Sequence, residues 1–151
     1  MLIYRISSSK YIEDLSGAGA KQYGGRWNNK GTAVVYLAES RAMAVMEVLV
    51  HLSPEQVDRP FVLATFDVPD DKIYDISIFD LPEDWRDPQT GDELKKIGDK
   101  FVRDGIYLLM KVPSIILEEE FNFIINPNHP DSKKIKLVNR RDFVFDKRFK
   151  T

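Results

Sequence analysis

One carboxylate stands inside an otherwise apolar stretch of this sequence. Residues 42–50 read Ala-Met-Ala-Val-Met-Glu-Val-Leu-Val, and Glu47 is the only charged residue among them. A helix that is apolar on nearly every face is expected to be buried, and a buried carboxylate is costly unless it is paired or hydrogen-bonded. Glu47 is therefore either half of a structural ion pair or an active-site carboxylate that projects from a buried helix.

A second candidate group lies in the segment Gly24-Gly25-Arg26-Trp27-Asn28. The two glycines allow a strand or a ligand to approach the backbone closely. A guanidinium binds phosphate or carboxylate through two parallel hydrogen bonds, so Arg26 is a candidate clamp for either group. The alternative is a surface arginine stacked on Trp27. Arg5 is a second possible clamp, although a structural role is favoured for a single arginine on a strand.

Three polar side chains near expected strand ends complete the set of candidates. Tyr36 ends a short apolar strand, where its ring can join the core or stack on a flat ligand while its hydroxyl forms a hydrogen bond. Ser114 ends a later strand, and Asn122 can turn inward from the strand after that. The two histidines, His51 and His129, do not lie in a nucleophile-elbow sequence, so a hydrolase triad built on Ser114 is not expected.

Composition excludes several classes of protein. The chain has 151 residues, enough for one domain with its own core, and no cysteine, which excludes disulfides and thiol chemistry. Two histidines without metal-ligand spacing argue against a metal site. A net charge of −2 does not favour binding to nucleic acid or to an anionic membrane. No signal peptide or membrane-spanning run is recognised, and we expect a cytoplasmic protein.

The elements that must position these groups follow from periodicity and turn residues. Strands are expected at 2–7, 33–37, 61–68, 73–76, 107–112, 121–125, 134–138 and 143–145. Helices are expected from an N-cap at Ser40 to about residue 52, and over 92–103. Residues 8–25 are expected to be a loop, and 79–91 an irregular surface segment. Many strands and two main helices in mixed order predict a single α+β domain over 1–151 with a mixed or antiparallel sheet.

Together these motifs resemble the RES domain, the toxin half of bacterial RES–Xre toxin–antitoxin pairs. The resemblance covers nearly the whole chain. The residues that carry it are Tyr4-Arg5, Gly24-Gly25-Arg26-Trp27-Asn28, Val35-Tyr36-Leu37-Ala38, Glu47, Pro113-Ser114, Asn122 and Asn126-Pro127-Asn128-His129-Pro130. The Arg, Glu and Ser that give the family its name correspond here to Arg26, Glu47 and Ser114, and none of these positions departs from the pattern. The stretch from Asp70 to Asp104 carries no family signature.

The resemblance implies a fold akin to ADP-ribosyltransferases and an activity on NAD⁺. It implies a toxin that cleaves the nicotinamide–ribose bond by hydrolysis or phosphorolysis, with NAD⁺ as substrate, phosphate as a possible co-substrate and no other cofactor. An Xre-type helix-turn-helix antitoxin and a homodimer are the implied partners. A mono-ADP-ribosyltransferase with a protein target is the alternative enzyme, and a non-catalytic binding module is the alternative of another class.

The implied chemistry agrees with the candidate residues. Cleavage of the nicotinamide–ribose bond builds positive charge on the ribose, which the Glu47 carboxylate can stabilise. Arg26, with Arg5 as a second clamp, can bind the pyrophosphate, and the Tyr36 ring can stack on nicotinamide. Ser114 can hydrogen-bond the substrate rather than attack it, and Asn122 is a further candidate for the same pocket. The acceptor of the ADP-ribosyl group remains open among water, phosphate and a protein side chain.

Overall fold

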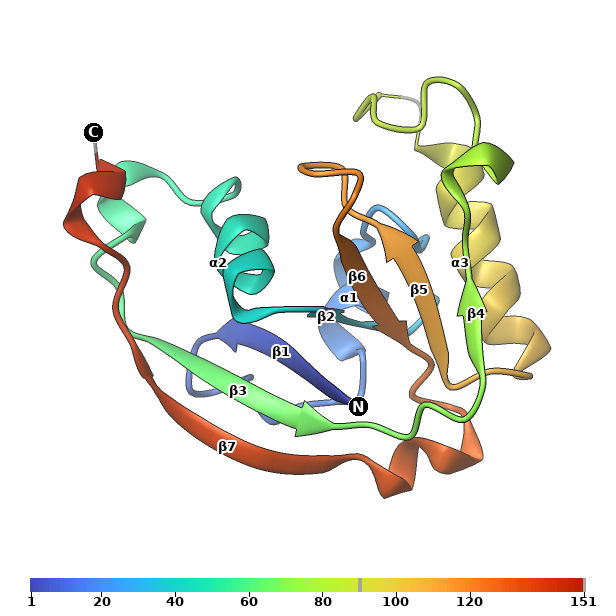
Figure 1. The fold of residues 1–151 in the computed structure, drawn as a ribbon, viewed down its shortest axis with the longest axis horizontal. Helices are drawn as coiled ribbons and strands as arrows, with labels where there is room; N and C mark the ends of the chain where they lie inside the picture. Colours follow the sequence, from blue (N-terminus) through green and yellow to red (C-terminus); the bar gives the residue numbers. More distant parts are fainter. Residues whose placement is uncertain (90, 151) are drawn as a thin grey trace.

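A seven-stranded mixed sheet is the framework of the molecule (Figure 1). The computed structural model describes residues 1–89 and 91–150. The strand order is β4-β5-β6-β2-β1-β3-β7, in which only β4 and β5 run parallel. The strands are β1 (Leu2–Ser7), β2 (Val35–Ala38), β3 (Phe61–Asp67), β4 (Ile73–Asp75), β5 (Leu109–Pro113), β6 (Phe121–Ile125) and β7 (Lys136–Phe143). The α+β prediction is confirmed.

Within residues 1–89 and 91–150, three α-helices accompany the sheet: α1 (Ala18–Tyr23), α2 (Arg41–Leu49) and α3 (Asp92–Asp104). The Ser40 side chain caps α2 as predicted, accepting a hydrogen bond from the Met43 backbone N–H at 3.1 Å. Gly105 closes α3 in the left-handed conformation that glycine adopts readily, at φ 64°. Short 3₁₀ turns occupy Pro54–Gln56, Ile78–Asp80, Pro130–Lys134 and Lys147–Lys150. No helix among the described residues is long and apolar enough to cross a membrane.

One face of the sheet carries both main helices. Tyr4 pairs with Ala38, and Ala38 with Asn122, so the side chains of these residues point to the same face. On that face α2 packs with Met43 and Ala44 over the β1–β3 half of the sheet, while α3 packs over the β4–β6 half with Leu94 and Phe101. The two halves are strongly twisted relative to each other (Figure 1). A cavity opens where the helices leave this face uncovered, and it extends past β1, where Arg5 and Ser7 also line it.

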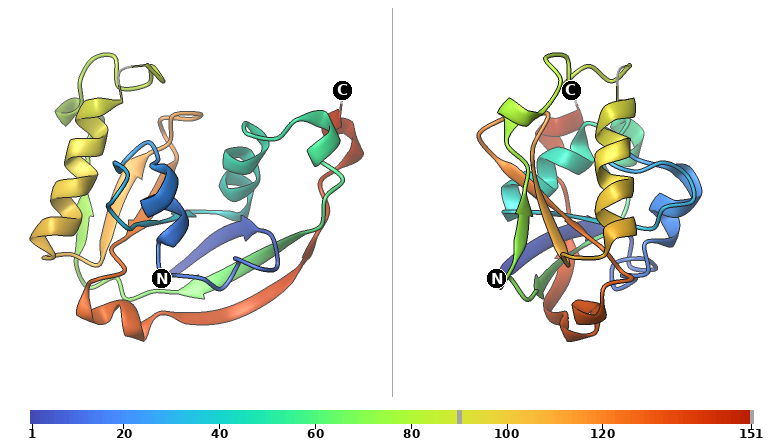
Figure 2. Two further views of the ribbon diagram at one scale, coloured as in Figure 1. Left: turned by 180° about the vertical axis from the view of Figure 1, so that it is seen from behind. Right: turned by 90° about the vertical axis from the view of Figure 1, so that its right-hand side faces the viewer.

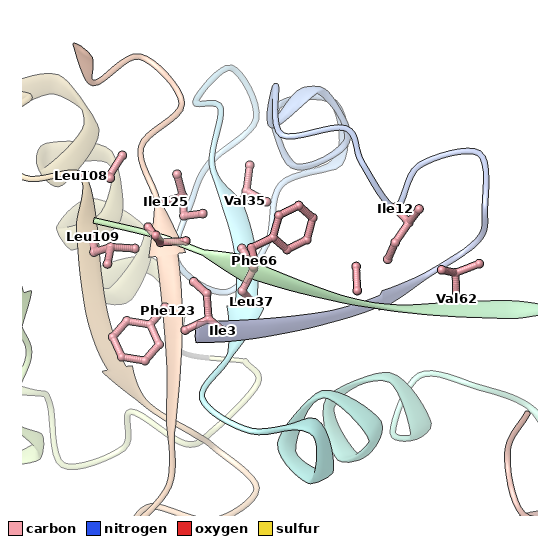
Figure 3. Packing of buried hydrophobic residues seen from close by; sticks show 12 residues of the cluster. Ile3, Ile12, Val35, Leu37, Val62, Phe66, Leu108, Leu109, Phe123 and Ile125 are labelled. Atoms are coloured by element: carbon pink, nitrogen blue, oxygen red, sulfur yellow. The ribbon is translucent and has the colours of Figure 1, made fainter. Parts of the chain in front are cut away.

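The opposite face holds the largest apolar cluster. Ile3, Val35, Phe66 and Phe123 belong to this cluster, and Ile12 from the segment after β1 joins it at the Val62 end (Figure 3). All five side chains are at most 3% exposed. Burial at this level typically contributes about 1.5–3 kcal/mol for each large apolar side chain. This cluster fixes the strands that carry the candidate site on their other face.

Four expectations about the elements are corrected. The expected loop 8–25 contains the short helix α1, which has no buried residue and therefore no apolar periodicity. The strands expected at 134–138 and 143–145 are one continuous strand, β7, which pairs with β3 along its length. The segment 79–91, of which residue 90 lies outside the described residues, is not purely a surface segment. Its Leu81 and Trp85 are buried against α3.

The fourth correction concerns α2, which is not the buried helix that its composition predicts. Only Met43 and Ala44 are buried, whereas Met46 and Val50 are 37% and 57% exposed. The helix ends at Leu49, three residues before the expected end, so it covers the sheet with little more than two turns. Glu47 is consequently half-buried at the wall of the cavity rather than enclosed in the core.

Strand β7 forms one edge of the sheet and is exposed along nearly its whole length. Three of its eight residues, Lys136, Arg140 and Arg141, are cationic. This arrangement is typical of an edge strand in a soluble protein.

Candidate functional site

A large open cavity of about 1380 Å³ collects most of the candidate residues. Its walls come from β1, α1, the segment between α1 and β2, α2, and the strands β2 and β6. The candidate residues that line it are Arg5, Arg26, Tyr36, Glu47 and Asn122. Arg5 and Glu47 are 42 positions apart in the sequence. They share this cavity because β1 and β2 are neighbours in the sheet and α2 follows β2 directly.

Glu47 is held by two neutral hydrogen-bond donors from the facing hairpin. The Ser114 hydroxyl, just beyond β5, donates to Glu47 Oε1 at 2.8 Å, and Asn122 Nδ2 on β6 donates to the same oxygen at 2.7 Å. Val112 and Asn122 are paired across β5 and β6, which brings the end of β5 beside Asn122. The carboxylate of a half-buried helix is thus fixed in orientation by two side chains more than 65 residues away in sequence.

Ser114 lies behind Glu47 and does not line the cavity. Its side chain is fully buried, and its Oγ accepts a hydrogen bond from the Ile116 backbone N–H at 3.1 Å while donating to Glu47. A buried hydroxyl that already donates to a carboxylate is poorly placed to contact a ligand. Within the described chain, its hydroxyl therefore contacts Glu47 and not the open space of the cavity.

Asn122 contacts both Glu47 and the cavity. Because a carboxylate oxygen can only accept, the side-chain amide must turn its Nδ2 toward Glu47, and this leaves Oδ1 on the other side. Asn122 Oδ1 is buried and has no hydrogen-bond partner among residues 1–89 and 91–150. An unsatisfied buried acceptor beside a cavity is uncommon in folded proteins.

Arg26 reaches the cavity from the glycine-containing segment before β2. Its Nη1 donates to the Trp85 carbonyl at 3.4 Å, which places the guanidinium between that segment and residues 82–89. Partial burial lowers the pKa of Arg26, and the nearby Glu47 carboxylate opposes this shift. The guanidinium therefore stays cationic and shares the cavity with Glu47, although the ion pairs of the described chain do not include an Arg26–Glu47 contact within 4.0 Å.

Tyr36 on β2 holds the segment that carries Arg26 through hydrogen bonds to Trp27 and Asn28. Its hydroxyl donates to Asn28 Oδ1 at 2.7 Å and accepts from the Trp27 backbone N–H at 3.0 Å. Burial raises the pKa of this hydroxyl well above its usual range, so it remains protonated. A Cβ atom at position 25 would stand 2.7 Å from the Tyr36 hydroxyl oxygen, which explains a glycine there. The ring lines the cavity, but both hydrogen bonds of the hydroxyl are made to protein groups.

Arg5 is held differently from Arg26. Its Nη1 donates to the carbonyls of Asp14, at 2.7 Å, and Ile12, at 3.4 Å. Burial lowers the pKa of Arg5, and the Asp14 carboxylate opposes this shift. Alternation along β1 points Arg5 away from the face that carries Tyr4 and Ile6. Arg5 therefore lines the cavity from the far side of β1, without a described contact to Glu47 or Arg26.

Asn28 was named only as part of the motif around Arg26, and the structure gives it a role of its own. The side chain is fully buried, and its Nδ2 donates to the carbonyls of Ala20, at 2.8 Å, and Thr32, at 3.0 Å. Asn28 therefore organises the whole segment around Arg26. No local signal distinguishes it from the exposed turn residue Asn29, because the partners of Asn28 are backbone groups brought close by the fold.

Glu47, Arg26 and the Tyr36 ring bring a carboxylate, a guanidinium and an aromatic surface into one cavity. Such a cavity suits a ligand with an anionic portion and a carbon centre that becomes positively charged. Among the described residues no group of three or more His, Asp or Glu side chains is arranged to hold a metal ion.

Comparisons with known proteins identify the family and the fold of this chain. Residues 2–146 match the family described as RES domain. A protein named Toxin Res from Photorhabdus laumondii is 41% identical over 150 residues, covering 98% of this chain and 96% of that protein. A protein named Prs ADP-ribosylating toxin from Sphingobium sp. is 40% identical over 139 residues, covering 90% of this chain and 86% of that protein.

A solved structure shares the fold. The crystal structure of the M. tuberculosis MbcT–MbcA toxin–antitoxin complex contains a chain that superposes with a TM-score of 0.79 at 20% sequence identity. The superposition covers 95% of this chain and 84% of that chain. At this level of identity the likeness establishes the fold.

Proposed function

Because this chain belongs to the RES domain family, we propose that it is the toxin of a toxin–antitoxin pair and that it cleaves the nicotinamide–ribose bond of NAD⁺. The observation that carries this proposal is the placement of Glu47. Its carboxylate lines the cavity, is held on one oxygen by Ser114 and Asn122, and shares the cavity with the Arg26 guanidinium.

The bond cleavage requires little from the protein beyond electrostatics. The C1′–N bond of the ribose breaks, its electron pair moves to the pyridinium nitrogen, and nicotinamide leaves as a neutral molecule. Positive charge then develops on the ribose ring, where the Glu47 carboxylate stabilises it. An acceptor hydroxyl adds at C1′ and loses its proton to the solvent or to Glu47. No acid is needed to protonate the leaving group, so one carboxylate suffices.

The cationic residues serve the other half of the substrate. Arg26 is suited to bind the pyrophosphate, because its guanidinium offers two parallel donors. Arg5 offers a second positive charge at the far wall of the cavity. The Tyr36 ring provides an apolar surface for a flat heterocycle. Its hydroxyl holds residues 24–29, the Arg26 segment, in place through Trp27 and Asn28.

Ser114 and Asn122 differ in what they can offer to the substrate. Ser114 orients Glu47 from a buried position. Asn122 lines the cavity and donates to Glu47, so it both orients the carboxylate and can touch the substrate. We therefore propose Glu47 and Arg26 as the residues that act on NAD⁺ and Ser114 as a residue that positions Glu47.

A second candidate reaction is transfer of ADP-ribose to a protein. It is favoured by the similarity to the Prs ADP-ribosylating toxin of Sphingobium sp.. Both reactions share the cleavage step and differ only in the acceptor, which is water or phosphate in the first reaction and a protein side chain in the second. NAD⁺ is a substrate in both, and no further cofactor is proposed.

A non-catalytic binding module fits the geometry less well. That alternative requires Glu47 and Arg26 to satisfy each other as a structural pair. Instead Glu47 accepts from two neutral donors, and Arg26 donates to the Trp85 carbonyl. Both charged groups line a cavity, where a substrate can reach them.

The proposed partners follow the same family membership. An antitoxin, expected to be of the Xre helix-turn-helix type, would hold the toxin inactive until it is removed. A homodimer and a cytoplasmic location are further parts of this proposal. Free toxin would then deplete NAD⁺ and arrest growth.

The experiment that tests the proposal is the consumption of NAD⁺ by purified protein without an antitoxin, with and without added phosphate. Nicotinamide with ADP-ribose indicates hydrolysis, and a phosphorylated ADP-ribose formed only with phosphate indicates phosphorolysis. If NAD⁺ is stable in both conditions but ADP-ribose appears on a cellular protein by mass spectrometry, transfer is the reaction. Absence of all three products contradicts an NAD⁺-cleaving activity.

A further inference from the structure

Helix α3 touches the segment that carries Arg26 at an unusually close point. A Cβ atom added at Gly98 would stand 1.6 Å from the Trp27 carbonyl oxygen and 2.7 Å from its carbonyl carbon. No side chain fits in that space, so the backbone of α3 rests directly on the backbone of Trp27. The view in the right panel of Figure 2 shows α3 alongside the segment that contains α1 and the residues after it.

The next residue of α3, Asp99, binds the same segment through two hydrogen bonds to Asn29. Asp99 Oδ1 accepts from the Asn29 backbone N–H at 3.0 Å, and Asp99 Oδ2 accepts from Asn29 Nδ2 at 2.7 Å. Both carboxylate oxygens of one residue are thus used on one residue of the segment. A hydrogen bond to a charged group is among the stronger ones in proteins.

These contacts are made next to residues already fixed from the other side. Trp27 and Asn28 are bound to the Tyr36 hydroxyl from β2, and the buried Asn28 amide ties the segment to Ala20 and Thr32. Arg26 is the residue immediately before this clamped stretch. Its backbone position is therefore set between β2 on one side and α3 on the other.

We propose that Asp99 and Gly98 of α3 are positioning residues for substrate binding, which act by holding the Arg26 segment at the wall of the cavity. The identity of the substrate rests on the proposed function. Helix α3, which carries no family signature, gains a role in binding that substrate. Asp99 does not act on the substrate. It acts through Asn29 and the backbone of Trp27 on the direction of the Arg26 guanidinium.

The fold itself depends on other residues of α3. Leu94 and Phe101 are buried and join the apolar cluster around Trp27, whereas Asp99 is only partly buried. Loss of the Asp99 carboxylate should therefore leave α3 in place and release mainly the Asn29 end of the segment. This separation allows positioning to be measured apart from folding.

The kinetic test compares Asp99→Ala with Glu93→Gln, a change in the exposed Glu93–Lys96 pair of the same helix. If Arg26 binds substrate and transition state alike, the KM for NAD⁺ rises about tenfold in Asp99→Ala while kcat changes less than about twofold. Glu93→Gln keeps both constants. An unchanged KM, or an equal fall in kcat, overturns the proposal.

A double-mutant cycle separates positioning from general damage. In the Arg26→Ala background, Asp99→Ala should raise KM no further, because the residue through which it acts is gone. If the two changes instead multiply, Asp99 acts independently of Arg26 and the proposal is wrong.

A measurement without substrate keeps this proposal distinct from the proposed function. Amide hydrogen exchange of residues 25–29 should accelerate in Asp99→Ala and not in Glu93→Gln, with the rest of α3 still protected. Unchanged exchange in that segment overturns the clamp whatever the activity. Faster exchange in a protein whose wild type leaves NAD⁺ intact supports the clamp and contradicts the proposed substrate.

Discussion

Glu47 and Arg26 both line the cavity, and they are held in opposite ways. Glu47 sits on α2, a short and half-exposed helix, and its orientation depends on two side-chain hydrogen bonds from Ser114 and Asn122. Arg26 sits on a segment without regular structure, but its neighbours Trp27 and Asn28 are buried and their contacts are largely with backbone. Side-chain hydrogen bonds orient the Glu47 carboxylate. The position of Arg26 instead depends on how the buried Trp27 and Asn28 beside it pack and hydrogen-bond.

This difference predicts different responses to substitution. Changes near Glu47 should affect the chemical step more than stability, because few buried contacts depend on the carboxylate. Changes near Arg26 should affect substrate affinity together with stability, because the same hydrogen bonds hold the segment and the sheet. The experiments below test that division.

The largest effect is expected from Glu47→Gln. This change keeps the shape of the side chain and removes the charge that stabilises the ribose cation, so kcat should fall about 100- to 1000-fold. The thermal unfolding midpoint should stay close to that of the wild type. Turnover of NAD⁺ is the measurement, with the exposed Glu119→Gln as the matched control. Full activity of Glu47→Gln would remove the carboxylate from the mechanism.

Arg26→Ala should act mainly on affinity. Loss of a charge-assisted contact to the pyrophosphate is worth about 2 kcal/mol, which corresponds to a roughly 30-fold rise in KM. Steady-state kinetics over a range of NAD⁺ concentrations measure it, and Arg59→Ala on the exposed surface is the comparison. A variant with wild-type KM and reduced kcat would place Arg26 at the reacting bond instead.

Tyr36→Phe tests whether the Arg26 segment is held by the fold. Removing the hydroxyl leaves the buried Asn28 Oδ1 without its donor and should lower the free energy of unfolding by about 1–3 kcal/mol. We expect the KM for NAD⁺ to rise in parallel. Tyr74→Phe, at a partly exposed tyrosine stacked on Tyr107, supplies the control. Normal stability combined with a raised KM would mean that the hydroxyl contacts substrate.

Ser114→Ala tests the other half of the comparison. The change removes one of two donors to Glu47, so kcat should fall about five- to tenfold, in line with about 1 kcal/mol for one hydrogen bond. In the Glu47→Gln background the same change should add little, because its effect passes through the carboxylate. A loss in Ser114→Ala as large as that of Glu47→Gln would instead indicate direct participation.

The smallest effect concerns acid stability at the α3 contact. Partial burial favours the neutral form of Asp99, but hydrogen bonds with Asn29 and Thr32, together with the Arg103 charge, outweigh it and hold the pKa below its ordinary value of 3.8. The carboxylate therefore stabilises the folded state at pH values above 3.8, and this contribution is lost as the pH falls through the lowered pKa. Thermal unfolding at neutral pH and near pH 3 should show a smaller acid-induced loss in Asp99→Asn than in the wild type. Equal losses would show that Asp99 does not contribute.

Elements that depend on local periodicity and capping could be predicted from the sequence. Features that depend on contacts between distant segments could not. The strand at Leu2–Ser7 and the helix capped by Ser40 were predicted because their apolar spacing and capping residues are local. The exposure of α2 could not be predicted, because composition does not show that a helix ends after about two turns and covers the sheet only in part. The single strand β7 was split because its solvent-facing residues lack apolar alternation.

The candidate site shows the same limit. Family motifs and residue chemistry selected the groups that line the cavity. They did not show that Ser114 is buried behind Glu47, or that Asn28 and Asp99 organise the Arg26 segment. Asp99 is one of several acidic residues along α3, and only its position opposite Asn29 distinguishes it.

The exposed strand β7 has a consequence for the protein at high concentration. An edge strand offers unpaired backbone groups to any other strand, and exposed apolar residues such as Val138 add to that tendency. Lys136 and Arg141 place like charges along the same edge, while Arg140 is paired with Glu13, so two copies that approach edge to edge repel each other through Lys136 and Arg141. The charged edge thus limits growth of the sheet into aggregates, and screening of its charges by salt would weaken that protection.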